Sequence, residues 1–353
     1  MSAMRDSQFN RARLDLARRR RGMTKRALAG AAGISIRSLA GYFRDEREPE
    51  QATAVRFAEI LRFPVGFFYG PTLDEVSQEG PSFRALSKMT ARQRDQATAG
   101  GTLGVYLCDW IERRFRLPEP DIPQYEYADP EIASMELRAR WGLGARPIRQ
   151  VVPLLELHGV RVFSLAEDTL SVDAYSVWRE ETPYIFLNTQ KSAERSRMDA
   201  AHELGHLVLH SRGGIQRNRQ AEREAQQFGA SFLMPRASVG STVRRGMSLE
   251  EIVRAKHHWT VSVAGLTYRL HELGLLTRYE YSQRFIEIGR LNYRTEEPEP
   301  APRERSQVLE KVFGRLKERG ISVAQVADEL SIHRDEVGKL LIGLVGFPVA
   351  LES

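Results

Sequence analysis

The chain has 353 residues, of which 42% are hydrophobic and 28% are charged, a balance typical of a globular protein with two or three domains. No stretch reaches the roughly 18 to 20 consecutive apolar residues of a membrane span, and the N-terminus lacks the apolar core of a signal peptide. The single cysteine, Cys108, excludes an internal disulfide, so we expect a cytoplasmic protein.

The net charge of +6 is concentrated at the N-terminus. Residues 1–70 contain 14 Lys and Arg against 7 Asp and Glu, and the rest of the chain is nearly neutral. A local basic excess indicates a polyanionic partner for this segment. The "RRRR" run by itself is explained equally well as a solvated helix face.

Hydrophobic periodicity and turn residues predict mostly helices, with one small sheet. In the first half of the chain we expect a helical unit over 9–70, a linker over 71–82, and helices over 83–117, 132–141 and 148–159. Three short strands should follow between 160 and 188, with a turn at 179–183. The rest should contain helices over 191–211 and 219–233, a charged Pro-rich linker at 294–305, and a helical tail over 305–343. The fold class is therefore mainly α with a small β-sheet (α+β). We place the domains at 1–70, 130–294 and 303–353, with a helical connector over 71–129.

The first helical unit contains "MTKRALAGAAGISIRSLAGYF". Thr24 is a suitable N-cap, Gly33 can take the left-handed conformation of a tight turn, and Ser35 can cap a second helix. An apolar face is expected from Ala27, Leu28 and Ala31, with Leu39 and Phe43 turned to the core. This is the helix-turn-helix layout, whose second helix enters the major groove of DNA.

The candidate DNA contacts lie on the outward face of this motif. Arg37 can pair with a guanine edge or with phosphate, while basic residues at the start of the preceding helix suit phosphate. The predicted set is Lys25, Arg26, Ser35, Ile36, Arg37, Ser38 and Gly41.

The residues "T-K-x-x-L-A-x-x-A-G-I-S", followed by "R-E-P" and "A-x-R-F-A-E-I-L", resemble the Cro/repressor-type (Xre) DNA-binding domain over about residues 9–70. The resemblance implies a double-stranded DNA operator as partner. The chain departs from the family at Lys25, where glutamine is common, and at Asp45, where glycine is common. The alternative is a small helical bundle with no DNA role.

A second motif, "HELGH", begins at His202. On a helix, His202 and His206 lie nearly on one line, so both can reach one zinc ion. Glu203 lies on the flank of that line, where it can act as a general base without binding the metal. The opposite side is apolar and faces a core, through Ala201, Leu204, Leu207 and Val208.

The third ligand is expected from "AEREAQQFGASFLMPR". Glu222 lies closer to the centre of the buried stripe than Glu224 does, so Glu222 is the predicted ligand and Glu224 the alternative. Gln226 could hydrogen-bond a ligand histidine. His210 is too far along the helix axis to share an ion with His202, so it is interpreted as a polar helix end or a second-layer donor.

Together, "KSAERSRMDAAHELGHLVLH" and "AEREAQQFGASFLMPR" resemble the ImmA/IrrE family of metallopeptidases, over roughly residues 130–280. The resemblance implies a zincin-like domain of the thermolysin type, a zinc ion held by two histidines and a glutamate, and cleavage of Xre-type repressors. Gln226 departs from the family, which usually has asparagine there. The segment "YIFLN", from Tyr184 to Asn188, could bind an extended peptide if it forms an edge strand.

The tail contains a faint repeat of the first motif, since "GISVAQVADELSIHRDEVGKLL" aligns with "GMTKRALAGAAGISIRSLAGYF". Acidic residues replace the basic ones, so repulsion from phosphate makes DNA binding by the tail unfavourable. We interpret the tail as a packing or dimerisation unit, and we expect a homodimer.

Three hypotheses remain from the sequence. The first is a DNA-binding regulator with an active zinc endopeptidase that cleaves a repressor protein or itself, in a stress or prophage-type response. The second is a regulator whose peptidase-like domain only senses a ligand or partner. The third is a stand-alone peptidase whose N-terminal domain recognises a protein.

Overall fold

The structure is a computed structural model, and it describes residues 8–76, 90–125, 129–165, 174–210 and 219–347. Within these residues the chain is mainly helical, with sixteen α-helices, one 3-10 helix and one sheet of three strands. This confirms the predicted fold class. No helix in the described part of the chain is long and apolar enough to cross a membrane.

The N-terminal domain is a bundle of short helices: α1 (Arg11–Arg20), α2 (Lys25–Ala31), α3 (Ile36–Phe43), α4 (Gln51–Leu61) and the 3-10 helix η1 (Val65–Tyr69). The predicted caps form, because the Thr24 side chain accepts from the Ala27 N–H and the Ser35 side chain accepts from the Ser38 N–H. Gly33 has a φ of +64°, which is the left-handed conformation that the turn between α2 and α3 requires.

The apolar face of α2 is rotated from the predicted one. Leu28 is buried as expected, but Ala29 is buried in place of Ala27 and Ala31, which are both exposed. Leu28 and Ala29 therefore form the buried side of α2.

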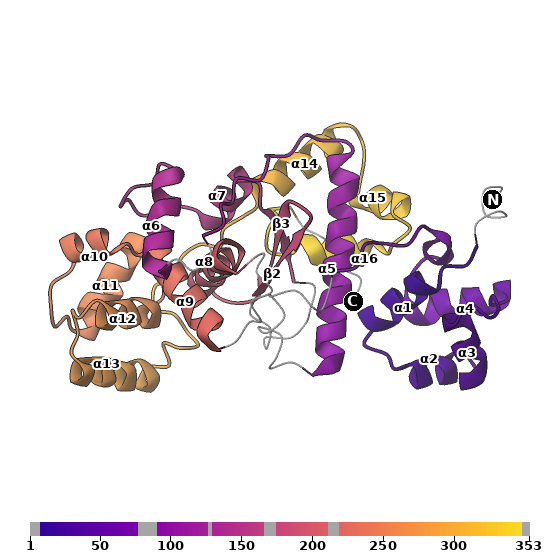
Figure 1. The fold of residues 1–353 in the computed structure, drawn as a ribbon, viewed down its shortest axis with the longest axis horizontal. Helices are drawn as coiled ribbons and strands as arrows, with labels where there is room; N and C mark the ends of the chain where they lie inside the picture. Colours follow the sequence, from indigo (N-terminus) through magenta and orange to yellow (C-terminus); the bar gives the residue numbers. More distant parts are fainter. Residues whose placement is uncertain (1–7, 77–89, 126–128, 166–173, 211–218, 348–353) are drawn as a thin grey trace.

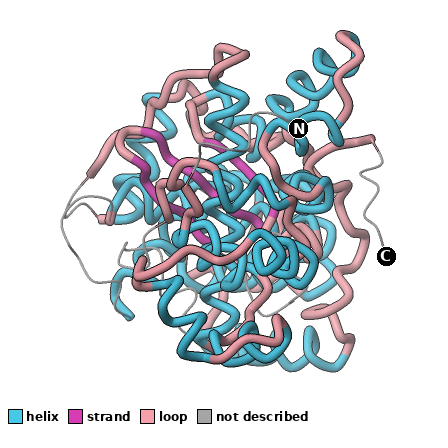
Figure 2. Tube along the Cα trace, turned by 90° about the vertical axis from the view of Figure 1, so that its right-hand side faces the viewer, coloured by secondary structure: helices cyan, strands magenta, loops and turns pink. Residues whose placement is uncertain are grey.

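The sheet contains β1 (Arg161–Ser164), β2 (Ala174–Arg179) and β3 (Thr182–Leu187), in the order β1-β3-β2. β3 pairs in parallel with β1 and antiparallel with β2. The strand that was expected to bind peptide from an edge is therefore the middle strand, so its backbone groups already pair on both sides. Figure 2 shows the strands crossing the middle of the molecule, surrounded by helices.

Helix α5 (Ala91–Glu112) lies against this sheet. Two glycines let it approach closely, since a methyl group at Gly101 would overlap the Tyr175 hydroxyl and one at Gly104 would lie 2.7 Å from the Phe186 ring. The Tyr175 hydroxyl donates to the carbonyl of Ala97 at 3.0 Å. Helix α5 also packs on α1 and on α16, and α16 itself reaches β1 (Figure 1).

The central domain continues with helices that pack around the sheet. They are α6 (Pro130–Arg140), α7 (Val151–Leu157), α8 (Ala193–Leu209), α9 (Arg219–Leu233), α10 (Arg236–Thr242), α11 (Leu249–Trp259), α12 (Val263–Glu272) and α13 (Arg278–Arg290). Helix α8 packs on β2 and β3, and α9 packs along α8 and α6. Figure 1 shows α8 and α9 between the sheet and the α10–α13 group.

The Pro-rich segment over residues 294–305 packs against the central domain, in contrast to the free linker that its composition suggests. Lys256 and Glu194 are each 1% exposed, and the Lys256 Nζ lies 3.5 Å from the Glu194 carboxylate and 3.3 Å from that of Glu297 in the segment. Glu304 forms an ion pair with the buried Arg197 of α8. These buried pairs fix the segment on α8 and α11.

The C-terminal residues fold into a second helix-turn-helix unit, formed by α14 (Gln307–Glu318), α15 (Val323–Glu329) and α16 (Arg334–Leu341). Helices α15 and α16 have the same lengths as α2 and α3 and stand at the sequence offset that the faint repeat predicts. Ser331 takes the left-handed place of Gly33, with a φ of +52°.

Candidate metal centre and nucleic-acid interface

Helix α8 carries two histidines of the candidate metal centre. The Ser192 side chain caps its start, and a buried apolar back holds it against the sheet, with Ala201, Leu204 and Val208 all fully buried. One helical turn therefore separates His202 from His206, and their Nε2 atoms lie 3.0 Å apart.

Glu222 of α9 faces both histidines. Its carboxylate oxygens lie 3.5 Å from Nε2 of His202 and 3.7 Å from Nε2 of His206. A tetrahedral zinc site with bonds of about 2.0–2.1 Å places neighbouring ligand atoms roughly 3.3 Å apart. The three side chains therefore fit a zinc ion in both chemistry and spacing.

Glu203 lies next to this triangle and has a different partner. It is almost fully buried, belongs to the same cluster as the two histidines within 4.8 Å, and its Oε2 accepts a hydrogen bond of 2.6 Å from the Ser176 hydroxyl on β2. The hydroxyl orients the carboxylate, as a general base requires. Ser176 was not among the predicted site residues, because it lies 27 residues away from Glu203, on a strand.

Glu224 points to a different partner from Glu222. Its carboxylate lies 2.9 Å from Nε2 of His210, and Nδ1 of His210 lies 3.1 Å from Nδ1 of His206. When His206 uses Nε2 toward a metal, its Nδ1 carries the proton and donates it to His210. Gln226, which was expected to support a ligand histidine, is exposed and has no hydrogen bond among the described residues, so His210 takes that role instead.

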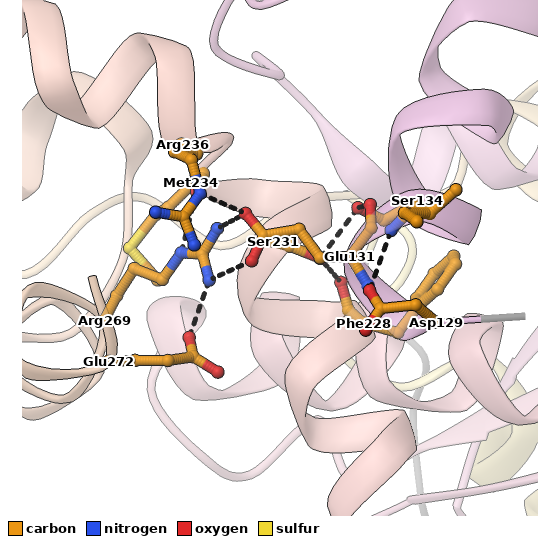
Figure 3. A network of polar contacts seen from close by, with 10 residues as sticks. Asp129, Glu131, Ser134, Phe228, Ser231, Met234, Arg236, Arg269 and Glu272 are labelled. Carbon is orange, nitrogen blue, oxygen red and sulfur yellow. Dashed lines mark hydrogen bonds and ion pairs between the residues drawn. The ribbon is translucent and has the colours of Figure 1, made fainter.

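A polar network holds α9 in place beside α6 and α12 (Figure 3). Arg269 of α12 is fully buried, and it donates to Glu131 of α6 at 2.7 Å and to the carbonyl of Met234 at 3.1 Å. The Ser231 hydroxyl of α9 donates to Ser134 at 2.7 Å. The network fixes the helix that presents Glu222.

The candidate DNA-binding face lies on α2 and α3. Ile36 is 54% exposed, Arg37 and Ser35 are exposed, and Ser38 is half-buried. Lys25 is exposed at the start of α2 and lies 4.2 Å from the centre of the Phe43 ring, and Arg26 is exposed beside it. These side chains can reach a DNA groove.

Gly41 does not belong to this face. It is buried, and a methyl group there would lie 2.9 Å from Nε of Arg47, so the prediction that Gly41 points outward is wrong. Asp45, the other departure from the Xre pattern, has a φ of +63°. That conformation favours glycine and is tolerated by aspartate, which explains both the family preference and this exception.

Two family models match the chain where the motifs lie. Residues 14–68 match the helix-turn-helix family, and residues 155–271 match the IrrE N-terminal-like domain, a peptidase family. A search among curated proteins found no match. The two matches confirm both resemblances, and they support a DNA-binding regulator that carries an IrrE-type peptidase domain.

Proposed function

We propose that this chain, which joins a helix-turn-helix domain to an IrrE-type peptidase domain, is a transcription regulator with zinc-dependent endopeptidase activity of the repressor-cleaving type. The observation that carries the proposal is the placement of Glu222 opposite His202 and His206, with Glu203 held separately by Ser176. The two acids beside the histidines have different partners. This arrangement suits Glu222 as a metal ligand and Glu203 as a general base.

The roles of the residues follow from these contacts. Bound zinc would supply Lewis acidity toward water and the scissile carbonyl. His202, His206 and Glu222 would hold the ion. Glu203 would accept a proton from the attacking water and later return it to the leaving amine, with its orientation fixed by the Ser176 hydrogen bond.

The substrate is a peptide segment, and β2 is the strand best placed to receive it. β2 is an outer strand of the described sheet, it packs on α8, and it carries Ser176. An extended peptide that adds to this edge would lie beside the metal centre. The segment would come from a repressor protein or from a second copy of this chain, in a stress or prophage-type response.

We also propose that the regulator acts as a homodimer on a double-stranded operator in the cytoplasm. The exposed basic side chains of α2 and α3 support the DNA contact. Dimers suit such domains because palindromic operators mirror a two-fold axis.

The variant Glu203→Gln tests the enzymatic part of the proposal. Glutamine keeps the size and the hydrogen bond to Ser176 but cannot take a proton. We expect normal zinc content by elemental analysis, normal operator binding by gel shift, and loss of cleavage of the chain itself or of a co-expressed Xre repressor.

A reporter gene under the operator separates this proposal from a domain that only senses a ligand or partner. An active peptidase predicts that the reporter responds to the inducing stress in the wild type and stays fixed in Glu203→Gln. Equal responses from both proteins would leave the sensor as the better account.

A further inference from the structure

The two helix-turn-helix units of the chain present opposite surfaces. In α3, which corresponds to a recognition helix, the first residues Ile36 and Arg37 are exposed. In α16, which occupies the equivalent place, the four consecutive residues from Asp335 to Gly338 are buried. In the second unit, the helix that corresponds to a DNA-contacting helix is therefore buried against the rest of the protein.

The partner of α16 is the basic end of α1. Glu336 is 2% exposed, and its two oxygens lie 2.7 Å from Nε of Arg20 and 2.5 Å from a terminal nitrogen of Arg21. Arg20 is itself buried, at 3% exposed. Arg21 also donates to the carbonyl of Leu61 at 2.6 Å, so the same guanidinium caps the C-terminal end of α4.

A second set of contacts widens this interface. Asp335 lies 3.6 Å from the Arg62 guanidinium, and a methyl group at Gly66 would touch the Ser331 hydroxyl at 3.5 Å. All of these N-terminal residues belong to α1, to the end of α4 or to η1. Figure 1 shows α2 and α3 on the side of the N-terminal domain away from α16.

The other end of α16 reaches the central domain. Leu340 packs beside Gly104 of α5. The carbonyl of Ile342 accepts a hydrogen bond of 2.9 Å from the Thr189 hydroxyl, which also lies 2.9 Å from that of Ser164. Thr189 lies in the short loop that leads from β3 into α8, the helix that carries His202 and His206.

We infer that the C-terminal helix-turn-helix unit is a protein-binding module whose partner is the DNA-binding domain of the same chain. Glu336 is its central contact, because its buried carboxylate pairs with both Arg20 and Arg21, and breaking a buried ion pair is costly. The module fixes the DNA-binding domain relative to the central domain, with the surface of α2 and α3 directed outward. It also connects that domain, through one helix, to the loop before α8.

Distance measurements on the full-length chain test this inference. Spin labels at Ala52→Cys on α4 and Ala324→Cys on α15 would occupy two exposed positions, one in each unit. The native Cys108 does not compete for label, because burial raises the pKa of its thiol to about 12. We expect one narrow distance distribution in the otherwise wild-type chain and a broad one in Glu336→Gln.

Asp328→Asn is the matched control, since Asp328 is an exposed acid of the same unit. It should keep the narrow distribution. The inference is overturned if Glu336→Gln also keeps it, or if Asp328→Asn broadens it equally. Arg21→Gln removes one of the two ion pairs at a more accessible position, and it gives the same test where Glu336→Gln does not fold.

Discussion

Two glutamates of one helix have different partners at the candidate metal centre. Glu222 and Glu224 stand two residues apart, so their side chains point about 200° apart around the α9 axis. One therefore faces the histidine pair, and the other faces His210. Glu224 contacts His210, which in turn contacts the His206 ring, so in the proposed zinc site they would orient that ligand.

The corresponding prediction concerns metal content. Glu222→Ala removes the proposed third ligand and should lower the zinc content far more than Glu224→Ala does. Glu224→Ala should disturb only the orientation of His206, and the loss of such an outer partner lowers metal affinity by roughly 10- to 100-fold. Elemental analysis and competition with a chelator measure both. A larger loss in Glu224→Ala would move the third ligand to Glu224.

Arg37 allows a residue-level prediction at the DNA interface. Its exposed guanidinium at the start of α3 can read a base edge, so Arg37→Ala should weaken binding to the specific operator by about 1–3 kcal/mol. Gel shifts on specific and unrelated DNA at several salt concentrations separate base reading from phosphate contact. Unchanged affinity on the operator would place the recognition surface elsewhere.

At the level of elements, the contacts that hold α9 against its neighbours make a distant residue important for the proposed metal site. Arg269 is fully buried between Glu131 and Glu272, and removing one partner of a buried charge network costs about 3–5 kcal/mol. Arg269→Met should therefore lower the free energy of unfolding by this amount in urea denaturation. It should also weaken zinc retention, although Arg269 contacts none of the ligands. Arg236→Met, at the exposed edge of the same network, serves as control and should change little.

The sequence predicted the helices and strands better than it predicted the contacts between them. The spacing of His202 and His206, the strands and the caps depend on neighbours within a few residues, so local periodicity sufficed. The antiparallel pairing of β2 with β3 follows from the short turn between them. The pairing of β1 with the other edge of β3 is a contact between distant segments, and it changed the expected peptide-binding strand.

The same reason explains the missed site residues. Ser176 meets Glu203 only because β2 passes beneath α8, and nothing near Ser176 in sequence indicates this. Gln226 was expected at the site because it lies one helical turn from Glu222, but its side chain is exposed in the structure. Gly41 was assigned outward from helix periodicity, and the long side chain of Arg47, from beyond the helix, covers it.

The whole molecule contains a pH-dependent interface. Burial favours a higher pKa for Glu336, but Arg20 and Arg21 outweigh burial and lower it to about 2, below the ordinary value of 4.5. The carboxylate is therefore stabilised in the folded state above about pH 4.5. The charged carboxylate contributes on the order of 3 kcal/mol to the free energy of unfolding, and this contribution is lost as the pH falls through 2.

Urea unfolding of wild type and Glu336→Gln checks this dependence. The stability difference between the two proteins should be largest at neutral pH and should shrink between pH 4.5 and 2, whereas other carboxylates titrate alike in both. A difference that stays constant across this range would mean that Glu336 is not held as a charged group.

The contact between Arg20 and Glu336 also sets an order of events during synthesis, because its partners lie 316 residues apart. At about 5–20 residues per second, the ribosome needs roughly 15–60 s to make the intervening chain. The DNA-binding domain emerges first and spends that time without its C-terminal partner. A nascent chain that has not reached α16 can therefore present α2 and α3 to DNA on a domain that is not yet docked, and the domain takes its fixed orientation only after α16 has been made.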